Sequence, residues 1–106
     1  MEPSPREFNI TRNIRVIEWL KAELVEAVAA LFKGMLKGSE EAIVDGLASI
    51  LITAYILGRR VGISFSRLDL MIQTKLKLSI HEAHEVEKWY GDLSALYEYL
   101  VNNKKR

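Results

Sequence analysis

Apolar residues recur at intervals of three and four along most of this chain, which is the spacing of one face of an α-helix. Over residues 14–35 they form one broad stripe, and arginine, lysine and glutamate side chains lie on the opposite side. The stripe comprises Ile14, Ile17, Leu20, Leu24, Ala27, Val28, Leu31, Phe32 and Met35. Because this period leaves almost no room for strands, the sequence predicts an all-α fold.

Local start and stop signals separate the first two predicted helices. Asn9 or Thr11 can cap a helix that runs to about Leu36, where a lysine and then Gly38 supply a cationic last turn and a stop. Ser39 follows at once and can cap the next helix, and two glutamates after it suit the positive end of a helix dipole. The sequence therefore predicts a tight helical turn at Gly38-Ser39.

The later boundaries are set by glycines and by serines that are followed three residues later by an acid. They fall at about Arg60 and Gly62, at Ser64 or Ser66, at Ser79, and at about Val101. Gly91-Asp92 lies inside the last predicted helix and indicates a kink or a break. We therefore expect a bundle of four to five helices.

The second predicted helix is apolar around nearly its whole circumference. Its main stripe runs through residues 43–61, while Ile52 and Ile56 lie nearly opposite it. A helix that is apolar on all sides is expected to be buried on all sides, and a second protomer is the economical cover in so short a chain. Its uncharged part, residues 47–58, is too short to cross a hydrocarbon core of about 30 Å, so no membrane partner is expected.

Composition predicts one small soluble domain. The chain has 106 residues, of which 49% are hydrophobic and 27% charged, and its net charge is +1. We expect a disordered arm at 1–8, a single domain at 9–102 and a basic tail at 103–106. The absence of a basic face argues against a nucleic-acid polymer as partner. The absence of cysteine excludes disulfides and, with no export signal visible, favours a cytoplasmic protein.

Two carboxylates one helical turn apart, Glu23 and Glu26, share one face of the first predicted helix. Asp45 follows near the start of the second predicted helix. If its carboxylate lies close to those of Glu23 and Glu26, the three would suit Mg²⁺. Proteins usually hold this ion with a few carboxylates, waters and substrate phosphates. Glutamates at this spacing are also common on solvated helices. Trp19 lies on the same face and costs about 2 kcal/mol to leave uncovered, which favours a covered, functional face.

The segments around these carboxylates resemble the MazG-like family of all-α nucleoside triphosphate pyrophosphohydrolases. The family's Glu-Glu-x-x-Glu motif corresponds here to Ala22-Glu23-Leu24-Val25-Glu26, and its Glu-x-x-Asp motif to Ala42-Ile43-Val44-Asp45. The apolar run that ends in Arg59-Arg60-Val61-Gly62-Ile63 resembles the family's second core helix and its exit. The likeness extends from Phe8 to about Leu96.

The resemblance implies a helical bundle that assembles as a dimer or tetramer. It also implies hydrolysis of a nucleoside triphosphate to the monophosphate and pyrophosphate, with Mg²⁺ or possibly Mn²⁺ as cofactor. Its implied catalytic residues and metal ligands are Glu23, Glu26 and Asp45. The candidate substrate-binding residues are Trp19, Arg59, Arg60 and Lys75, with Lys77 as a looser candidate.

Two acidic positions of the family motifs are missing, because Ala22 and Ala42 stand where glutamates are usual. Glu41 lies four residues before Asp45 on the same face and is a substitute metal ligand. This incomplete motif keeps an alternative open, in which a catalytically lapsed bundle serves as a protein-interaction or nucleotide-sensing module.

Two further groups have weaker functional signals. His81 and His84, with Glu85, have partial metal-ligand spacing, but no further ligand follows, so we expect surface residues. Four aromatic side chains near the C-terminus lie among leucines and are expected to pack in the core or at an interface. These four are Trp89, Tyr90, Tyr97 and Tyr99.

Overall fold

The structure, a computed structural model, describes the backbone of residues 5–82 and 85–104 and the side chains of residues 9–82 and 88–103. Within these ranges every regular element is an α-helix, and there is no strand. The helices are α1 (Pro5–Lys37), α2 (Glu40–Arg60), α3 (Phe65–His81), α4 (Glu85–Tyr90) and α5 (Asp92–Lys104). The predicted all-α class with up to five helices is therefore confirmed.

The chain divides into two compact units, residues 1–65 and residues 66–106. The first unit holds α1 and α2, and the second holds nearly all of α3 together with α4 and α5. Each unit is described by itself below. The expectation of a single domain over residues 9–102 stays a prediction.

Helix α1 begins at Pro5, earlier than the predicted start at Asn9 or Thr11. Proline suits the first helical position, because its missing N–H would have no partner there and its φ is already helical. Residues 5–8 therefore belong to the helix backbone, and residues 1–4 lie outside the described residues. The disordered arm at 1–8 stays a prediction.

The predicted turn between the first two helices is confirmed. Gly38 has a φ of +68°, and its N–H donates to the Met35 carbonyl at 3.2 Å while the Ser39 N–H donates to the Gly34 carbonyl at 3.1 Å. Ser39 then caps α2, because its hydroxyl accepts a hydrogen bond from the Ala42 N–H at 3.2 Å. Two residues therefore reverse the chain between long helices.

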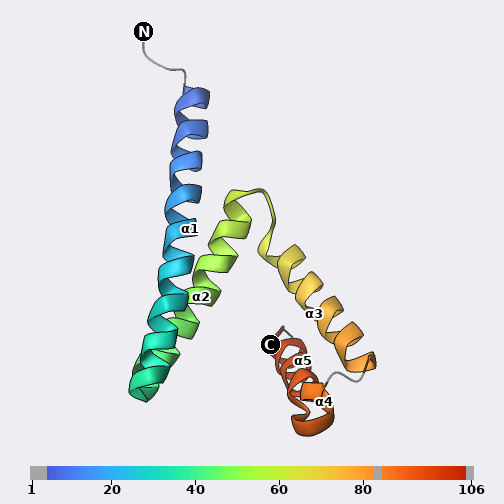
Figure 1. The fold of residues 1–106 in the computed structure, drawn as a ribbon. Coiled ribbons are helices and arrows are strands. Elements are labelled where there is room, and N and C mark those ends of the chain that lie inside the picture. Colours follow the sequence, from blue (N-terminus) through green and yellow to red (C-terminus); the bar gives the residue numbers. More distant parts are fainter. Residues whose placement is uncertain (1–4, 83–84, 105–106) are drawn as a thin grey trace. The chain divides into compact units, whose positions relative to one another are not determined.

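Helices α1 and α2 pack side by side as an antiparallel hairpin (Figure 1). The contact is built on small residues, because a Cβ added to Gly34 would lie 3.0 Å from the Ala42 Cβ, and one added to Gly46 would lie 3.0 Å from the Leu31 Cα. The buried apolar side chains of the hairpin all come from α1. They are Leu20, Ala27 and Leu31.

Within the first unit, helix α2 is not buried on all sides, and its coverage by a second protomer stays a prediction. Gly46 is its one buried residue, while large apolar side chains on both of its faces are exposed. These side chains are Val44, Leu47, Leu51, Ile52 and Ile56. One long hairpin partner covers one side of a helix, so the first unit by itself leaves a large apolar surface uncovered.

Among the described residues, α2 is the one helix whose length and mean hydropathy would allow it to cross a membrane. The helix has 21 residues, whereas its uncharged stretch has about a dozen. Of its most apolar 18-residue segment, 6% is buried. A single helix of this kind is weak evidence for a span, because core helices of soluble proteins meet the same criteria. The absence of a membrane partner stays a prediction.

The open end of the hairpin is fixed by polar and aromatic contacts. The Asn13 side-chain amide donates to the Arg60 carbonyl at 3.0 Å, which ties α1 to the last turn of α2. The Arg59 guanidinium lies 5.2 Å from the centre of the Phe65 ring, and Tyr55 meets the same ring edge to face at 5.9 Å. These contacts position the arginines at the end of α2.

The second unit differs from the prediction at Ser79 and agrees with it at Gly91. Ser79 lies inside α3, so the predicted helix start there is wrong. Gly91 has a φ of +67° and separates α4 from α5, as expected.

In the second unit Leu76 is buried, and the Lys77 ammonium lies 5.6 Å from the Tyr97 ring centre. Trp89, Tyr90 and Tyr99 are exposed within the second unit, and their packing at an interface stays a prediction.

Candidate functional site

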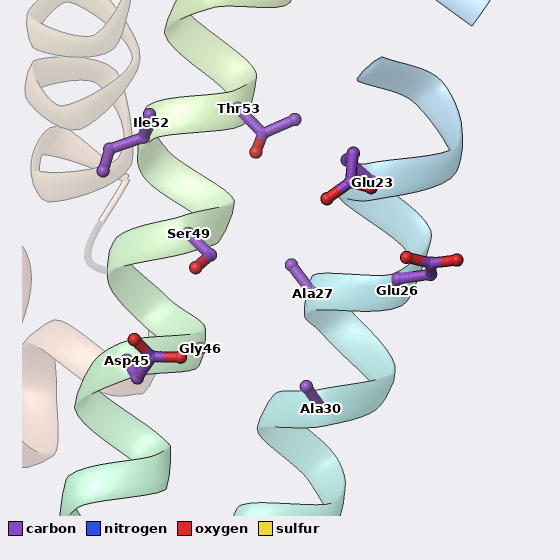
Figure 2. A pocket seen from close by; sticks show the side chains of 9 residues that line it. All are labelled: Glu23, Glu26, Ala27, Ala30, Asp45, Gly46, Ser49, Ile52 and Thr53. Carbon is purple, nitrogen blue, oxygen red and sulfur yellow. The ribbon is translucent and has the colours of Figure 1, made fainter. Parts of the chain in front are cut away.

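A groove of about 310 Å³ runs between α1 and α2. Carboxylates and hydroxyls alternate along it with small side chains, and Figure 2 shows Glu23 and Thr53 facing one another across it. Its lining residues are Glu23, Glu26, Ala27, Ala30, Asp45, Gly46, Ser49, Ile52 and Thr53. The three predicted acidic residues therefore do lie on one groove.

Their positions along the groove differ, however. Gly46 packs on Leu31, so its neighbour Asp45 lies about eight residues further along α1 than Glu23. At a rise of about 1.5 Å per residue, this places the two about 12 Å apart along the helix axes, and Glu26 about 7 Å from the level of Asp45. Figure 2 agrees, with Asp45 beside Gly46 and well below Thr53 in the view.

This offset prevents the three carboxylates from closing on one ion within a single chain. Oxygen ligands of Mg²⁺ lie at about 2.1 Å from the metal, so they must approach one another to about 3 Å. Among the described residues no group of three histidine, aspartate or glutamate side chains is arranged to hold a metal. The role of Glu23, Glu26 and Asp45 as joint metal ligands therefore stays a prediction.

The groove supplies hard oxygen atoms in two settings. Glu23 is half-buried, whereas Glu26 and Asp45 are exposed. Ser49 and Thr53 lie one turn apart on α2 and are half-buried, and within the described residues neither hydroxyl has a hydrogen-bond partner. These hydroxyls and carboxylates can therefore bind a polar ligand or its bound waters without breaking an existing bond.

The other predicted site residues lie outside this groove. Glu41 borders a second hollow on α2 with Glu40 and Asp45. Trp19 is exposed on α1 one turn before Glu23, and Arg59 and Arg60 are exposed in the last turn of α2. Lys75 is exposed on α3 and belongs to the second unit, as does Lys77.

The model of the MazG-like family matches residues 10–93, which is well over half of the chain and includes both helices of the groove. The chain belongs to the MazG-like family. Comparison of the sequence with curated proteins and with solved structures gives no match. MazG-like membership therefore rests on the family model and on the helical fold.

The two alanines of the MazG-like motifs both lie off the groove. Ala22 is exposed and does not line it. Ala42 is half-buried, and its Cβ faces Gly34 at the contact between the two helices. A longer side chain at position 42 would have to leave this contact, so the small residue there matches the close packing of this hairpin.

Four residues that line the groove were not predicted from the sequence as site residues, namely Ala27, Ala30, Gly46 and Thr53. The position of the turn could have predicted these residues. A reversal at Gly38-Ser39 fixes which position on α2 lies opposite which position on α1. Counting back from that turn sets Thr53 opposite Glu23. Of the predicted histidine pair, His81 is exposed at the end of α3, and His84 lies outside the described residues.

Proposed function

We propose that this MazG-like chain is a cytoplasmic, Mg²⁺-dependent nucleotide pyrophosphohydrolase that converts a nucleoside triphosphate to the monophosphate and pyrophosphate. The observation that carries the proposal is the placement of Glu23, Glu26 and Asp45 on one groove in a member of this family. The resemblance also implies a homo-oligomer, a dimer or a tetramer, as the working form.

The oxygen donors of the groove suit Mg²⁺ if waters and substrate phosphates supply the remaining ligands. Its donors are carboxylate and hydroxyl oxygens, which Mg²⁺ prefers, and this ion is commonly held by one or two carboxylates with waters and substrate phosphates. The separation of Asp45 from Glu23 does not suit an ion enclosed by protein alone. Glu26, Glu23 and Asp45 are therefore proposed as ligands that act with a triphosphate, and Glu41 as a further ligand near Asp45.

The proposed roles rest on the chemistry of each side chain. Bound magnesium would offset phosphate charge and supply an activated water. Glu23, half-buried and facing the hydroxyl of Thr53, is placed to orient or deprotonate a water in the groove. Arg59 and Arg60 offer bidentate donors for phosphate oxygens. Trp19 offers an aromatic surface to a base, and Lys75 is carried over from the resemblance.

Pyrophosphate release tests the proposal directly. The full chain is incubated with a panel of common and modified nucleoside triphosphates, each with Mg²⁺, with Mn²⁺ or with a chelator. We expect metal-dependent release of pyrophosphate from at least one member of the panel. No release from any triphosphate with either metal would refute the enzymatic function.

A second candidate function is a nucleotide-sensing or protein-interaction module that has lost the chemistry. It is favoured by the absence, among the described residues, of a three-ligand acidic cluster and by Ala42 packing at the helix contact. Thermal unfolding in a matrix of metals and nucleotides separates the alternatives, because a ligand that binds the folded state raises the midpoint. A sensor would be stabilised without turnover, and an interaction module would show neither effect.

A further inference from the structure

Ser49 and Thr53 have the side chains of the groove that can donate a hydrogen bond. Among the described residues that line it, the other polar side chains are Glu23, Glu26 and Asp45, and an ionised carboxylate accepts hydrogen bonds but donates none. The remaining lining residues are apolar or glycine. The side chains of the groove can therefore hold a negatively charged ligand in two ways, through cations bound to the carboxylates and through these two hydroxyls.

The fold itself does not use either hydroxyl. A serine or threonine inside a helix can donate to the carbonyl four residues before it, and Thr74 in α3 does so, with the Leu70 carbonyl at 2.9 Å. Ser49 and Thr53 make no hydrogen bond of this or any other kind in the described parts of the chain. Both side chains lie on the side of α2 that faces α1 (Figure 2). A half-buried hydroxyl in this situation is available to a ligand.

The two hydroxyls follow Asp45 along the groove toward the level of Glu23. Asp45, Ser49 and Thr53 succeed one another at intervals of four residues, so they form one column along α2. Thr53 faces Glu23 across the groove, and Asp45 lies at the other end of the column. The separation of about 12 Å that keeps Glu23 and Asp45 from sharing one ion is thus lined by hydrogen-bond donors.

This spacing favours a ligand that extends along the groove. Side chains one turn apart on a helix have Cβ atoms about 5–6 Å apart, so each hydroxyl can reach a different oxygen of a ligand that lies along α2. Ala27 and Ala30 stand on the α1 side, where their small side chains leave the groove a volume of about 310 Å³. A chain of phosphate groups carries charged acceptor oxygens in a row and matches this arrangement.

We propose that Ser49 and Thr53 bind the phosphate chain of the ligand, with each hydroxyl donating to a non-bridging phosphate oxygen beside the Mg²⁺ held by the carboxylates. The inference rests on the proposed binding of a nucleoside triphosphate in this groove, and it adds two contacts from within the groove to those of the arginines outside it. The contacts do not depend on hydrolysis. A chain that senses nucleotides without cleaving them would use the same two hydroxyls.

Binding of inorganic triphosphate in the presence of Mg²⁺ tests the proposal without requiring a particular base. Isothermal titration calorimetry of the full chain compares variants that lose a hydroxyl, Thr53→Val and Ser49→Ala, with variants that keep one, Thr53→Ser and Ser49→Thr. A hydrogen bond to a charged group changes affinity by about tenfold or more. We therefore expect at least about tenfold weaker binding in the first pair and nearly the original affinity in the second pair.

Three controls separate ligand binding from a structural role. Thr11→Val removes an exposed hydroxyl of α1 about 18 Å along the helix from Glu23 and should leave binding unchanged. The unfolding midpoint of Thr53→Val, measured without ligand, should not fall, because this hydroxyl has no bond in the fold to lose. Titration with Mg²⁺ alone should give the same result for Thr53→Val as for the original chain, because the proposed contact is with phosphate.

The proposal is overturned if inorganic triphosphate with Mg²⁺ does not bind the original chain, or if the variants without a hydroxyl bind it as tightly as the variants that keep one. It is also overturned if Thr53→Val weakens the binding of Mg²⁺ alone to the same extent. Failure of the enzymatic function is observed separately, as the absence of pyrophosphate release from every nucleoside triphosphate. Hydroxyl-dependent binding without release would refute the enzyme and support this inference.

Discussion

Gly46 and Leu31 meet so closely that a Cβ added to Gly46 would lie 3.0 Å from the Leu31 Cα and 3.2 Å from its backbone nitrogen. The two helices therefore touch nearly backbone to backbone at this level. This close approach brings the hydroxyls of Ser49 and Thr53 near α1 and gives the groove its shape. A position with no side chain thus determines where the polar side chains of the candidate site lie.

We predict that Gly46→Ala destabilises the chain. Alanine favours a helix by about 1 kcal/mol over glycine, but overpacking against a backbone that cannot move aside typically costs 1–3 kcal/mol, so the net change is a loss of stability. Chemical denaturation measures it. Ala48→Ser, an exposed change on the same helix, is the matched control and should stay within about 0.5 kcal/mol. A stabilised Gly46→Ala variant would contradict the close contact.

Gly38 gives a second prediction about stability. Its φ of +68° lies in the left-handed region, and nothing stands within 4 Å of the position of an added Cβ. Gly38→Ala should therefore lose about 1 kcal/mol through backbone strain alone. Gly38→Asn should lose less, because asparagine tolerates this conformation better. Equal losses in the two variants, measured by thermal unfolding, would show that strain at the turn is not the cause.

The carboxylates of the groove give a functional prediction. Glu23→Gln, Glu26→Gln and Asp45→Asn should each reduce pyrophosphate release by about a hundredfold or more, because Glu23 is proposed to accept a proton from the attacking water and the other two to hold the metal. Stability should change by less than about 0.5 kcal/mol for the exposed Glu26 and Asp45. Glu18→Gln is the control on the outer face of α1 and should retain activity. Full activity in the Glu23 variant would remove that residue from the mechanism.

Trp19 fluorescence should report assembly. The second tryptophan, Trp89, is 70% exposed and lies in the other unit, so Trp89→Phe leaves Trp19 as the emitting residue. We expect its emission to shift to shorter wavelength as protein concentration rises, because dimerisation removes the exposed ring from water. An emission maximum that is independent of concentration would argue against Trp19 lying in an interface.

Local signals predicted the helices well where one or two residues decide a boundary. Gly38 and Ser39 act through a left-handed backbone and a side-chain cap, and Gly62 and Gly91 also take positive φ values. Ser79 shows the limit of such signals. It has the spacing of a capping box but lies within α3, because a serine with an acid three residues later can also be accommodated inside a helix that continues.

By itself, the sequence determined that the chain is helical, where α1 ends and α2 begins, and that Glu23, Glu26 and Trp19 share a face, because these properties depend on neighbours within a few residues. The tertiary structure decided how far Asp45 lies from those glutamates and which surfaces of α2 stay uncovered. Both depend on how two helices are paired along their lengths. That pairing is set by a two-residue turn and by contacts such as Gly46 with Leu31, between residues distant in the sequence.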